Sequence, residues 1–323
     1  MSKKLRVAVV GVGGISGAHI PSWMAMDDVE LKAICDIRPE MMEKYPEVRH
    51  YTDCDEMLDK EELDVLDICL PTFLHVEYAL KGIEHGLHVI TEKPVSLHED
   101  DPARVYKAAK EHGVQFMVAH CLRFWPAYCY VKEAYDSGRY GKLLSASMWR
   151  LGDIPLWTWD DWMRDEKRSG FIPYDLHIHD LDFMIYAFGA PKTVSCRRSK
   201  EPDQDYLTAL YDYGDFFITC ESSWYKARYP FTSGFRFQFE NALLVNADDV
   251  FSIYDTEGNV LHPLASADDS NAQVEFPTSD AYFNEILYFK NCLMEGRPVD
   301  IMNEEQLTTV IHILNSFPGA INK

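Results

Sequence analysis

One segment of the sequence carries an acid, an imidazole and a second acid at helical spacing. Asp175, His179 and Asp182 stand at positions i, i+4 and i+7, so a helix would present all three on one face. An imidazole oriented by a carboxylate can accept the proton of an alcohol while a hydride leaves the same carbon. Because His177 would point from a different face, a metal site that combines the two histidines with neighbouring acids is sterically awkward, and we expect no metal.

A lysine follows the apolar run of residues 87–91. Lys93 lies in the sequence Thr91-Glu92-Lys93-Pro94, where the proline restricts the direction of the chain after the lysine. A partly desolvated amine at the end of a buried strand can share a proton with a substrate hydroxyl. Pairing of Lys93 with Glu92 or with a phosphate is equally compatible with these residues, so both interpretations stay open.

A glycine-rich segment near the N-terminus is the element expected to bind a cofactor. An apolar, β-branched run leads into Gly11, Gly13 and Gly14, and a helix is expected to begin near Ile15. Gly11 allows a tight turn, Gly13 lets a pyrophosphate approach the backbone, and the first N–H groups of the helix favour an anion. With Ser16 in the third position the motif is G-x-G-x-x-S, a looser form of the dinucleotide fingerprint. A turn that uses its glycines only for geometry is the alternative.

A second strand-like run ends in a carboxylate that suits a ribose. Residues 29–35 lead into Asp36, at roughly the 20-residue offset expected for the ribose-binding acid of a dinucleotide site. Such an acid accepts hydrogen bonds from ribose hydroxyls and repels a 2′-phosphate, which favours NAD over NADP. Arg38 nearby weakens this preference, and a solvated acid at a strand end is the alternative interpretation of Asp36.

Two further segments carry side chains suited to a ligand. Pro71 bends the chain outward after another strand-like run, so that Thr72 and His75 can contact a ribose or an amide. An ordinary helix cap or surface residue is the alternative for His75. Residues 157–164 contain three tryptophans and Arg164 in a predicted loop. Aromatic side chains beside polar ones form good sugar-binding walls, but they also form hydrophobic plugs.

The order of the predicted elements indicates two domains with different sheets. Strand-like runs alternate with single helices through residue 121, which predicts βαβ units and a parallel sheet for residues 1–121. Residues 122–323 then contain several strand-like runs without helices between them, which predicts a large open, mainly antiparallel sheet. Helices are predicted at residues 281–295 and 303–316. The broad aromatic sheet face suits a subunit interface, so we expect a homo-oligomer, a dimer or tetramer, although the domain's own helices could cover that face.

The composition indicates a globular protein that does not bind nucleic acid. Hydrophobic residues make up 47% of the chain and charged residues 26%, as in enzymes of this size. The net charge of −21 argues against nucleic acid and anionic membrane surfaces as partners. The N-terminal Met-Ser-Lys-Lys leads straight into a strand-like run and no window of about 18 apolar residues follows, so we expect no membrane segment and a cytoplasmic location. Eight cysteines without C-x-x-C spacing are expected to be reduced, buried thiols.

Taken together, several motifs make the chain similar to one known family. They are the glycine fingerprint, P-T-x-x-H at residues 71–75, E-K-P at 92–94, Arg123-Phe124, and D-x-x-x-H at 175–179. With these motifs the chain resembles the glucose-fructose oxidoreductase, inositol dehydrogenase and rhizopine catabolism (Gfo/Idh/MocA) family over nearly its whole length. The resemblance implies an α/β N-terminal Rossmann domain with a doubly wound parallel sheet, an α+β C-terminal domain, NAD(P), and oxidation of a ring hydroxyl on a sugar or cyclitol.

The same resemblance implies roles for individual residues. Lys93, Asp175 and His179 match the family's catalytic set, with His179 as the proton acceptor, Lys93 as the cation that positions the hydroxyl, and Asp175 as the group that orients them. Arg123 and Arg164 match positions near cofactor or substrate. The residues expected to contact the cofactor are Gly11, Gly13, Gly14, Ile15, Asp36, Pro71, Thr72, His75, Glu92, Arg123 and Arg164. The residues expected to contact the substrate are Lys93, Trp157, Trp162, Tyr174 and His179.

One departure from the family pattern precedes and follows Asp175. Residues 171–174 and His177 are bulky where the family has small residues. They are expected to border the substrate pocket, which makes the chemistry a safer inference than the substrate. We expect an NAD-dependent dehydrogenase or reductase that moves hydride between nicotinamide C4 and a secondary carbinol of a small polyhydroxylated molecule. The alternatives are a redox-neutral enzyme that uses tightly bound NAD, as in glycoside cleavage, and a non-catalytic dinucleotide-binding regulator.

Overall fold

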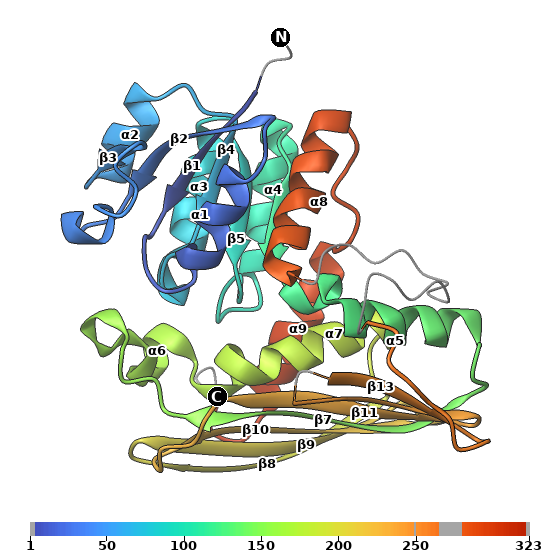
Figure 1. Ribbon diagram of the computed structural model, residues 1–323. Helices are drawn as coiled ribbons and strands as arrows, with labels where there is room; N and C mark the ends of the chain where they lie inside the picture. The colour runs from blue at the N-terminus through green and yellow to red at the C-terminus, as the bar shows by residue number, and fades with distance from the viewer. Residues whose placement is uncertain (1–3, 249, 265–279, 321–323) are drawn as a thin grey trace. The chain divides into compact units, whose positions relative to one another are not determined.

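The computed structural model describes residues 4–248, 250–264 and 280–320, which form two compact units (Figure 1). Unit 1 consists of Met1–Cys121 and Asp280–Thr308, and unit 2 consists of Leu122–Ser279 and Thr309–Lys323. Each unit is built on its own sheet.

Residues 280–308 lie in unit 1, whereas the sequence predicted that all of residues 122–323 form the second domain. This stretch begins with α8 (Ala281–Glu295), which packs against α1 (Ser16–Met24). Lys290 Nζ on α8 lies 2.7 Å from the Asp28 carboxylate. The bounds of α8 agree with the predicted helix, but an apolar helical face does not specify which surface will cover it, so the partner of α8 escaped prediction.

Unit 1 contains a six-stranded parallel sheet in the order β3-β2-β1-β4-β5-β6. The strands are β1 (Leu5–Val10), β2 (Val29–Cys35), β3 (Arg49–Tyr51), β4 (Val65–Ile68), β5 (His88–Glu92) and β6 (Phe116–Ala119). The central strands are buried because helices cover both faces of the sheet. This confirms the predicted doubly wound parallel sheet. The strand order reverses between β1 and β4, and ligands of such sheets bind outside the carboxyl ends of the strands at this point.

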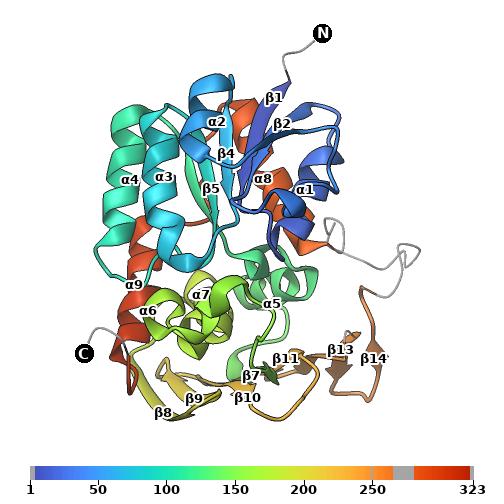
Figure 2. The same cartoon turned by 90° about the vertical axis from the view of Figure 1, so that its left-hand side faces the viewer.

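The helices of unit 1 lie on opposite faces of this sheet. Figure 2 shows α3 and α4 on one face and α1 and α8 on the other. The helical segments of the unit not yet given bounds are η1 (Pro39–Met41), α2 (Cys54–Lys60), η2 (Thr72–Leu74), α3 (His75–Glu84) and α4 (Asp101–His112). Side chains from α1 and α3 therefore approach the ends of β4 and β5 from opposite sides.

Unit 2 contains an eight-stranded sheet in the order β14-β13-β12-β11-β7-β10-β9-β8. All neighbouring strands are antiparallel except β7 and β10, which run parallel. The strands are β7 (Leu143–Asp153), β8 (Thr193–Glu201), β9 (Gln204–Asp212), β10 (Phe217–Tyr225), β11 (Thr232–Phe239), β12 (Ala242–Ala247), β13 (Val250–Asp255) and β14 (Val260–Leu261). The predicted open, mainly antiparallel sheet is thus confirmed, with β13 and β14 as strands that the sequence did not reveal.

Helices cover one face of this sheet (Figure 1). The remaining helical segments are η3 (Cys121–Phe124), α5 (Pro126–Ser137), η4 (Trp159–Arg164), α6 (Glu166–Ser169), η5 (Pro173–His177), α7 (Ile178–Phe188) and α9 (Glu304–Ser316). Tyr128 of α5 packs edge-on against Phe183 of α7 and Phe235 of β11, with both ring-centroid distances 4.9 Å. Such aromatic contacts add packing specificity to the buried area. They hold α5 and α7 in place over the strands.

Candidate functional site

The glycine turn at the end of β1 has the geometry of an anion-binding loop. Gly11 has a φ of 89°, and a Cβ there would lie 2.6 Å from the carbonyl oxygen of Cys69, so a side chain is excluded. At Gly13, by contrast, a Cβ would meet no described atom within 4 Å apart from the neighbouring residues. Ser16 is fully buried and its hydroxyl donates to the Gly13 carbonyl at 2.8 Å. Among the described residues no side chain caps α1, which leaves its first N–H groups suited to a phosphate.

Asp36, the predicted ribose acid, is anchored to the glycine turn itself. Its carboxylate accepts the Val12 N–H at 2.8 Å and the Arg38 N–H at 2.9 Å, and the Arg38 guanidinium lies 3.1 Å away. The side chain is 7% exposed. A further contact, from Arg38 Nη2 at 3.3 Å, brings the hydrogen bonds to four, about the number that a carboxylate can accept. These contacts fix the orientation of Asp36, and a ribose hydroxyl would have to replace the Arg38 guanidinium. The turn and the acid therefore form one rigid element whose chemistry fits a dinucleotide.

His75 does not have the position expected for a cofactor contact. The side chain is 1% exposed, with Nδ1 2.6 Å from the Pro94 carbonyl oxygen and Nε2 2.7 Å from the Leu70 carbonyl oxygen. Burial lowers the pKa of His75, although both carbonyls favour the protonated ring. Both ring nitrogens are thus occupied by main-chain groups, and the prediction that His75 reaches a ribose or an amide is corrected. Thr72, three residues earlier, is also buried.

Glu92 also turns inward, although it was expected to contact the cofactor. It is 6% exposed, its Oε2 accepts the Lys93 N–H at 3.0 Å, and its Oε1 lies 3.0 Å from His19 Nε2. Burial favours the neutral acid, but the hydrogen bond and the charge of His19 lower the pKa of Glu92 below its ordinary value. Glu92 therefore fixes the backbone amide of Lys93 by a hydrogen bond from the interior of the unit. Lys93 itself is partly exposed at the end of β5, and Pro71 is partly exposed after β4.

The segment that carries Asp175 and His179 is not a single α-helix. Residues Pro173–His177 form a π-helical turn, and α7 begins at Ile178. Both Asp175 and His179 are partly exposed. A π turn contains an extra residue relative to the α-helix and is frequent at functional sites. The predicted helical face is therefore interrupted between the two residues, a feature that the spacing alone could not reveal.

His177 lies in the core of unit 2. It is completely buried, with Nε2 2.6 Å from the Tyr211 hydroxyl and Nδ1 3.0 Å from the Ser222 hydroxyl. Burial, assisted by the charge of Arg150, lowers the pKa of His177 to about 3. The expectation that His177 borders the substrate pocket is therefore wrong, because its ring packs between the helical layer and the sheet.

Two buried ion pairs engage acids of the same segment. Arg123 Nε and Nη2 donate to the two carboxylate oxygens of Asp182 at 2.9 and 2.7 Å, and both side chains are inaccessible to solvent. Arg150 Nε donates to Asp180 at 3.0 Å. Asp182 is consequently a structural partner of Arg123 and not a third member of a proton-transfer face. The guanidinium of Arg123, which was expected near the cofactor or substrate, joins η3 to α7.

The residues predicted to form a substrate wall are dispersed. Tyr174 is 1% exposed and its hydroxyl donates to Asn315 Oδ1 at 2.6 Å, so this ring belongs to the core and its assignment to the substrate is corrected. Trp157 is 75% exposed and Trp162 is partly exposed. Arg164 pairs with Asp203 at 2.5 Å on the rim of a pocket of about 670 Å³. This pocket lies among η4, α6 and the β8–β9 turn. Its basic side chains Arg164, Arg168 and Lys200 each form an ion pair with an acidic side chain.

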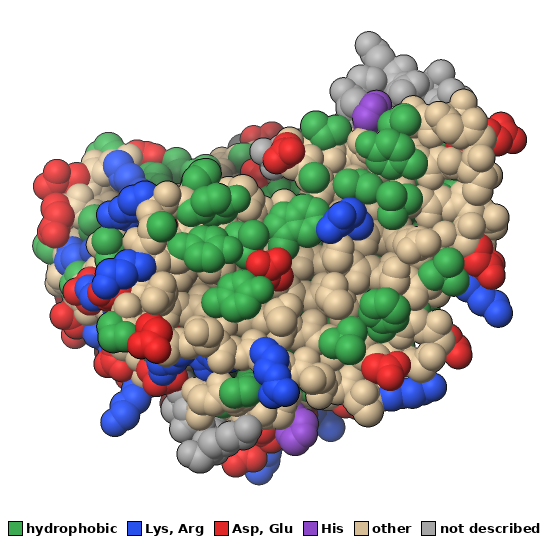
Figure 3. Space-filling model, turned by 90° about the horizontal axis from the view of Figure 1, so that it is seen from below, with side chains coloured by type: hydrophobic (Ala, Val, Ile, Leu, Met, Phe, Trp, Pro, Cys, Tyr) green, Lys and Arg blue, Asp and Glu red, His purple; other side chains and the backbone are tan. Residues whose placement is uncertain are grey.

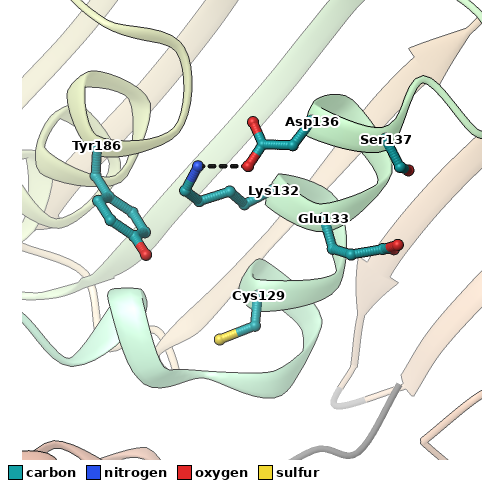
Figure 4. Close-up of a pocket in the computed structure, with 6 residues that line it drawn as sticks. All are labelled: Cys129, Lys132, Glu133, Asp136, Ser137 and Tyr186. Atoms are coloured by element: carbon teal, nitrogen blue, oxygen red, sulfur yellow. Dashed lines mark hydrogen bonds and ion pairs between the residues drawn. The ribbon is translucent and has the colours of Figure 1, made fainter. Parts of the chain in front are cut away.

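A second pocket, of about 510 Å³, lies on α5 and α7 (Figure 4). It is lined by Cys129, Lys132, Glu133, Asp136, Ser137 and Tyr186. Lys132 points to the carboxylate of Asp136 on the same helix, at 2.7 Å. None of the residues predicted for chemistry lines this pocket.

Three buried polar residues of unit 1 had no role in the sequence analysis. His19 on α1 lies with both ring nitrogens near carboxylates, Asp67 sits in β4, and Glu285 lies on the buried side of α8. All three are completely buried. The available signals were an acid inside the apolar run of residues 65–68 and a glutamate on the apolar side of a helix. Such breaks in an apolar pattern indicate a buried polar contact without identifying the partner.

Two family descriptions match the chain. "Oxidoreductase family, NAD-binding Rossmann fold" matches residues 5–120, and "GFO/IDH/MocA C-terminal domain" matches residues 128–260. The two together span most of both units.

Curated relatives match over shorter stretches. The chain is 32% identical over 138 residues to a 2,7-anhydro-N-acetylneuraminate hydratase of Mediterraneibacter gnavus, a match that covers 43% of this chain and 37% of the relative. It is 31% identical over 191 residues to a myo-inositol 2-dehydrogenase of Thermotoga maritima, which covers 57% of this chain and 55% of the relative. The chain thus spans about half the length of the curated relatives it matches, 37% and 55% in these two cases.

Solved structures match over nearly the whole chain. A levoglucosan dehydrogenase in complex with NADH and levoglucosan has a TM-score of 0.82 at 19% identity, with 97% of this chain and 96% of that chain covered. A dehydrogenase from Chromobacterium violaceum has a TM-score of 0.81 at 17% identity, with 98% and 95% covered. At these identities the likeness shows the fold. None of the described helices is long and apolar enough to cross a membrane.

Proposed function

The chain belongs to the GFO/IDH/MocA family of oxidoreductases with an NAD-binding Rossmann fold, and we propose that it is an NAD-dependent dehydrogenase or reductase of a polyhydroxylated substrate. The hydride would move between nicotinamide C4 and a secondary carbinol of a sugar, cyclitol or related polyol. The observation that carries this proposal is the hydrogen bond from Val12 N–H to Asp36 at 2.8 Å, which joins the phosphate-binding turn and the ribose acid. Relatives named D-glucoside 3-dehydrogenase and myo-inositol 2-dehydrogenase support the substrate class.

Three side chains would carry the proton chemistry. NAD, when bound, supplies the hydride acceptor. His179 would take the proton of the substrate hydroxyl, Lys93 would donate a hydrogen bond to the same oxygen, and Asp175 would orient them. Partial exposure of all three is compatible with contact to a ligand. Glu92 and His75, which face the interior, are left out of the set that touches ligand.

The test is turnover on a panel of sugars and cyclitols, followed by NADH absorbance. On a working substrate, Lys93→Ala and His179→Ala should each lower kcat by about 10²- to 10⁴-fold, while the Kd for NAD stays within about threefold of the parent value because neither group holds the diphosphate. Lys107→Ala and His112→Ala, on the exposed side of α4, are the matched controls and should leave kcat unchanged.

Two results would overturn this assignment. Full activity of both the Lys93 and the His179 variants would show that other groups move the proton. Substrate conversion without accumulation of NADH would instead show a redox-neutral reaction with retained cofactor. Tight NAD binding without turnover on any polyol would point to a regulator.

The preference for NAD over NADP is assigned to Asp36. Its carboxylate, held by Val12 and Arg38, would accept hydrogen bonds from the ribose hydroxyls and repel a 2′-phosphate. Asp36→Ala should weaken NAD binding by about 10- to 100-fold, from the roughly 1.5–3 kcal/mol of a charged hydrogen bond. NADP binding should be unchanged or tighter, since Arg38 then lacks its carboxylate partner. Equal weakening for both cofactors would contradict the assignment.

We place a second copy of this chain on the outer face of the unit 2 sheet. Large apolar side chains are exposed there, namely Tyr206, Leu210, Phe217 and Tyr254, at 36–47%. Figure 3 shows hydrophobic side chains gathered over this face with few charged groups among them. Arg197, Glu221 and Arg236 also lie on this face. Since the chain carries a net charge of −21, a face on which apolar side chains outnumber charged ones, with two cations among the latter, is the surface on which two copies can meet without strong repulsion.

Light scattering tests the self-association. The parent chain should be a dimer or tetramer, and Leu210→Asp combined with Phe217→Asp should give a monomer, because the charges would be buried without partners. Met294→Asp, at an exposed apolar position on α8, is the control and should keep the parent mass. A monomeric parent, or an unchanged mass in the double variant, would contradict the interface.

The cytoplasm is the proposed location. Burial raises the pKa of the Cys35, Cys54 and Cys69 thiols to about 12, which keeps them protonated and unreactive, as suits a protein that functions with reduced cysteines. Cell fractionation would test the location, and recovery in an extracytoplasmic fraction would contradict it.

A further inference from the structure

The ends of β4 and β5 are joined by a completely buried imidazole. His19, on α1, has Nδ1 2.9 Å from an Asp67 carboxylate oxygen and Nε2 3.0 Å from Glu92 Oε1. Asp67 lies in β4 and Glu92 is the last residue of β5. Trp23, one turn further along α1, donates its indole N–H to Asp67 at 2.7 Å. A chain of hydrogen bonds thus runs from α1 through both strands.

This chain ends at the backbone of Lys93. The second carboxylate oxygen of Glu92 accepts the Lys93 N–H at 3.0 Å. Because Glu92 is held by His19 on one side and holds the Lys93 amide on the other, a displacement of the imidazole would move the peptide from which the lysine side chain leaves the strand. Displacements of about 1 Å near a reacting group can cost roughly 100-fold in rate.

A second buried imidazole joins the same two strand ends from the opposite face of the sheet. His75, the first residue of α3, lies 2.7 Å from the Leu70 carbonyl oxygen after β4 and 2.6 Å from the Pro94 carbonyl oxygen after β5. Figure 2 shows α1 and α3 on opposite faces of the sheet. Both sequence neighbours of Lys93 therefore contact a buried histidine: Glu92 contacts His19, and Pro94 contacts His75.

The proton content of the first bridge follows from its geometry. Both nitrogens of His19 lie within hydrogen-bond distance of a carboxylate oxygen, an arrangement that favours a proton on each nitrogen and hence an imidazolium. Burial opposes this charge, but Asp67 and the other neighbouring groups raise the pKa of His19 well above its ordinary value. Glu285 completes the surroundings: it is fully buried, and neither of its carboxylate oxygens has a hydrogen-bond partner among the described residues.

The same atoms could in principle hold a metal ion. The ligand atoms of His19, Glu92 and Glu285 lie within 4.8 Å of one another. A metal needs a lone pair on the imidazole, whereas Nε2 of His19 serves as a donor to Glu92 and Nδ1 as a donor to Asp67. Burial and the charge of Glu92 raise the pKa of Glu285 well above its ordinary value, which favours the neutral acid. An imidazolium between two carboxylates with a neutral acid beside them accounts for all these groups.

We propose that His19 and His75 are positioning residues for Lys93. They hold the segment Glu92–Pro94 from the two faces of the sheet, and so set the place from which the lysine amine meets the substrate hydroxyl. This inference rests on the proposed role of Lys93, to which it adds the two residues that make the role possible.

Variants of His75 give the cleaner test because they leave no charge unpaired. His75→Phe removes the two ring nitrogens that face the carbonyls, one of which carries the N–H in the neutral ring. It should lower kcat by about 10- to 100-fold, with KM for substrate and Kd for NAD within about threefold. His75→Gln retains two N–H donors and should recover a large part of kcat. Met57→Ala, in a fully buried position of α2, is the destabilised control, and its kcat should equal that of the parent although its Tm is lower.

A double-mutant cycle tests the path from His19. His19→Gln and Glu92→Gln should each lower kcat by about 10- to 100-fold, and the double variant should be no slower than the slower single variant, since both act on the same contact. Multiplication of the two losses would overturn the path through Glu92. A fall in kcat of His75→Phe that only parallels its Tm, as in Met57→Ala, would reduce His75 to a structural residue.

The activity of Lys93→Ala distinguishes failure of the proposed catalytic role of Lys93 from failure of the positioning role of His19 and His75. If Lys93→Ala retains activity, the proposed catalytic role fails before positioning is in question. If Lys93→Ala is inactive while the His19 and His75 variants keep full kcat, the role of Lys93 stands and the positioning inference is wrong.

Discussion

His19 in unit 1 and His177 in unit 2 are both completely buried, yet their surroundings drive their charge in opposite directions. His19 lies between two carboxylates. Burial opposes its charge, but Asp67 and Cys69 raise its pKa well above the ordinary value. His177 lies between the hydroxyls of Tyr211 and Ser222, and burial lowers its pKa to about 3. Equal burial therefore does not determine the charge of a histidine; the charge of its hydrogen-bond partners does.

The contrast also separates two structural tasks. The imidazolium of unit 1 joins two strands that end at a proposed catalytic lysine. The neutral imidazole of unit 2 joins a π turn to the sheet, beside the segment that carries Asp175 and His179. In each unit a buried histidine lies in or beside the element that carries a partly exposed side chain proposed to act in catalysis.

The largest difference is expected when each ring loses its polar atoms. His19→Phe leaves Asp67 and Glu92 buried with their counter-charge removed, and should lower the free energy of unfolding by about 3–5 kcal/mol. His177→Phe leaves only two neutral hydroxyls without their partner and should cost about 1–3 kcal/mol. Urea unfolding at pH 7 measures both. Equal losses would contradict the assignment of a charged His19 and a neutral His177.

A pH series sharpens the same comparison. The folded pKa of His177 is depressed from 6.5 to about 3, so the unfolded chain binds a proton below pH 6.5 that the folded chain refuses. This group should therefore lower the free energy of unfolding by about 1.4 kcal/mol for each pH unit below that value. His177→Gln should lose this part of the slope. His19 acts in the opposite sense, because its raised folded pKa stabilises the fold below pH 6.5 and that contribution disappears as the pH rises through the folded value.

Replacement of Glu285 should have a smaller effect on stability, and it should stabilise the fold where the loss of a buried contact usually destabilises it. Its folded pKa is raised well above 4.5, so the folded chain keeps a proton that the unfolded chain releases above that pH. Stability should fall as the pH rises from 4.5 towards the raised value. Glu285→Gln removes this penalty and should raise Tm at neutral pH, with kcat unchanged. A lower Tm for the variant at neutral pH would show that Glu285 is ionised in the fold.

The smallest effect is expected for a surface ion pair. Lys132 and Asp136 lie 2.7 Å apart on α5, at one turn's spacing, and the Asp136 side chain is 55% exposed (Figure 4). Asp136→Asn should lower the free energy of unfolding by only about 0.3–0.5 kcal/mol, because water and salt screen the pair. The result gives the reference against which the buried bridges are judged. A loss above that of His177→Phe would contradict this order.

Local pattern predicted much of the fold. The β-branched run before Gly11, the alternating residues of β9 and the helical stretch of α8 each carry a periodicity that one short segment contains in full. The glycine turn and Asp36 were accessible for the same reason, since a tight turn and a strand-end acid depend on adjacent residues. Lys93, Asp175 and His179 stay predictions, drawn from the order and spacing of their motifs.

The directions of polar side chains were not accessible in this way. His75, Glu92 and Tyr174 were expected to contact ligands, but each is buried against a group that is remote in the sequence or reached only after a turn of the chain. The partner of Tyr174, for example, is Asn315, 141 residues later. No spacing rule connects such pairs, because each contact exists only after the helices of that unit have packed on its sheet.

The amino-acid sequence by itself determined where most of the strands, turns and helices form, since steric limits on the backbone and the alternation of apolar residues act within a few positions. Only the tertiary structure decided that His19 bridges Asp67 and Glu92, that His177 is neutral, and that α8 joins unit 1. The reason is physical: the charge of a buried group depends on the groups that packing brings within hydrogen-bond distance, and these are set by the whole fold.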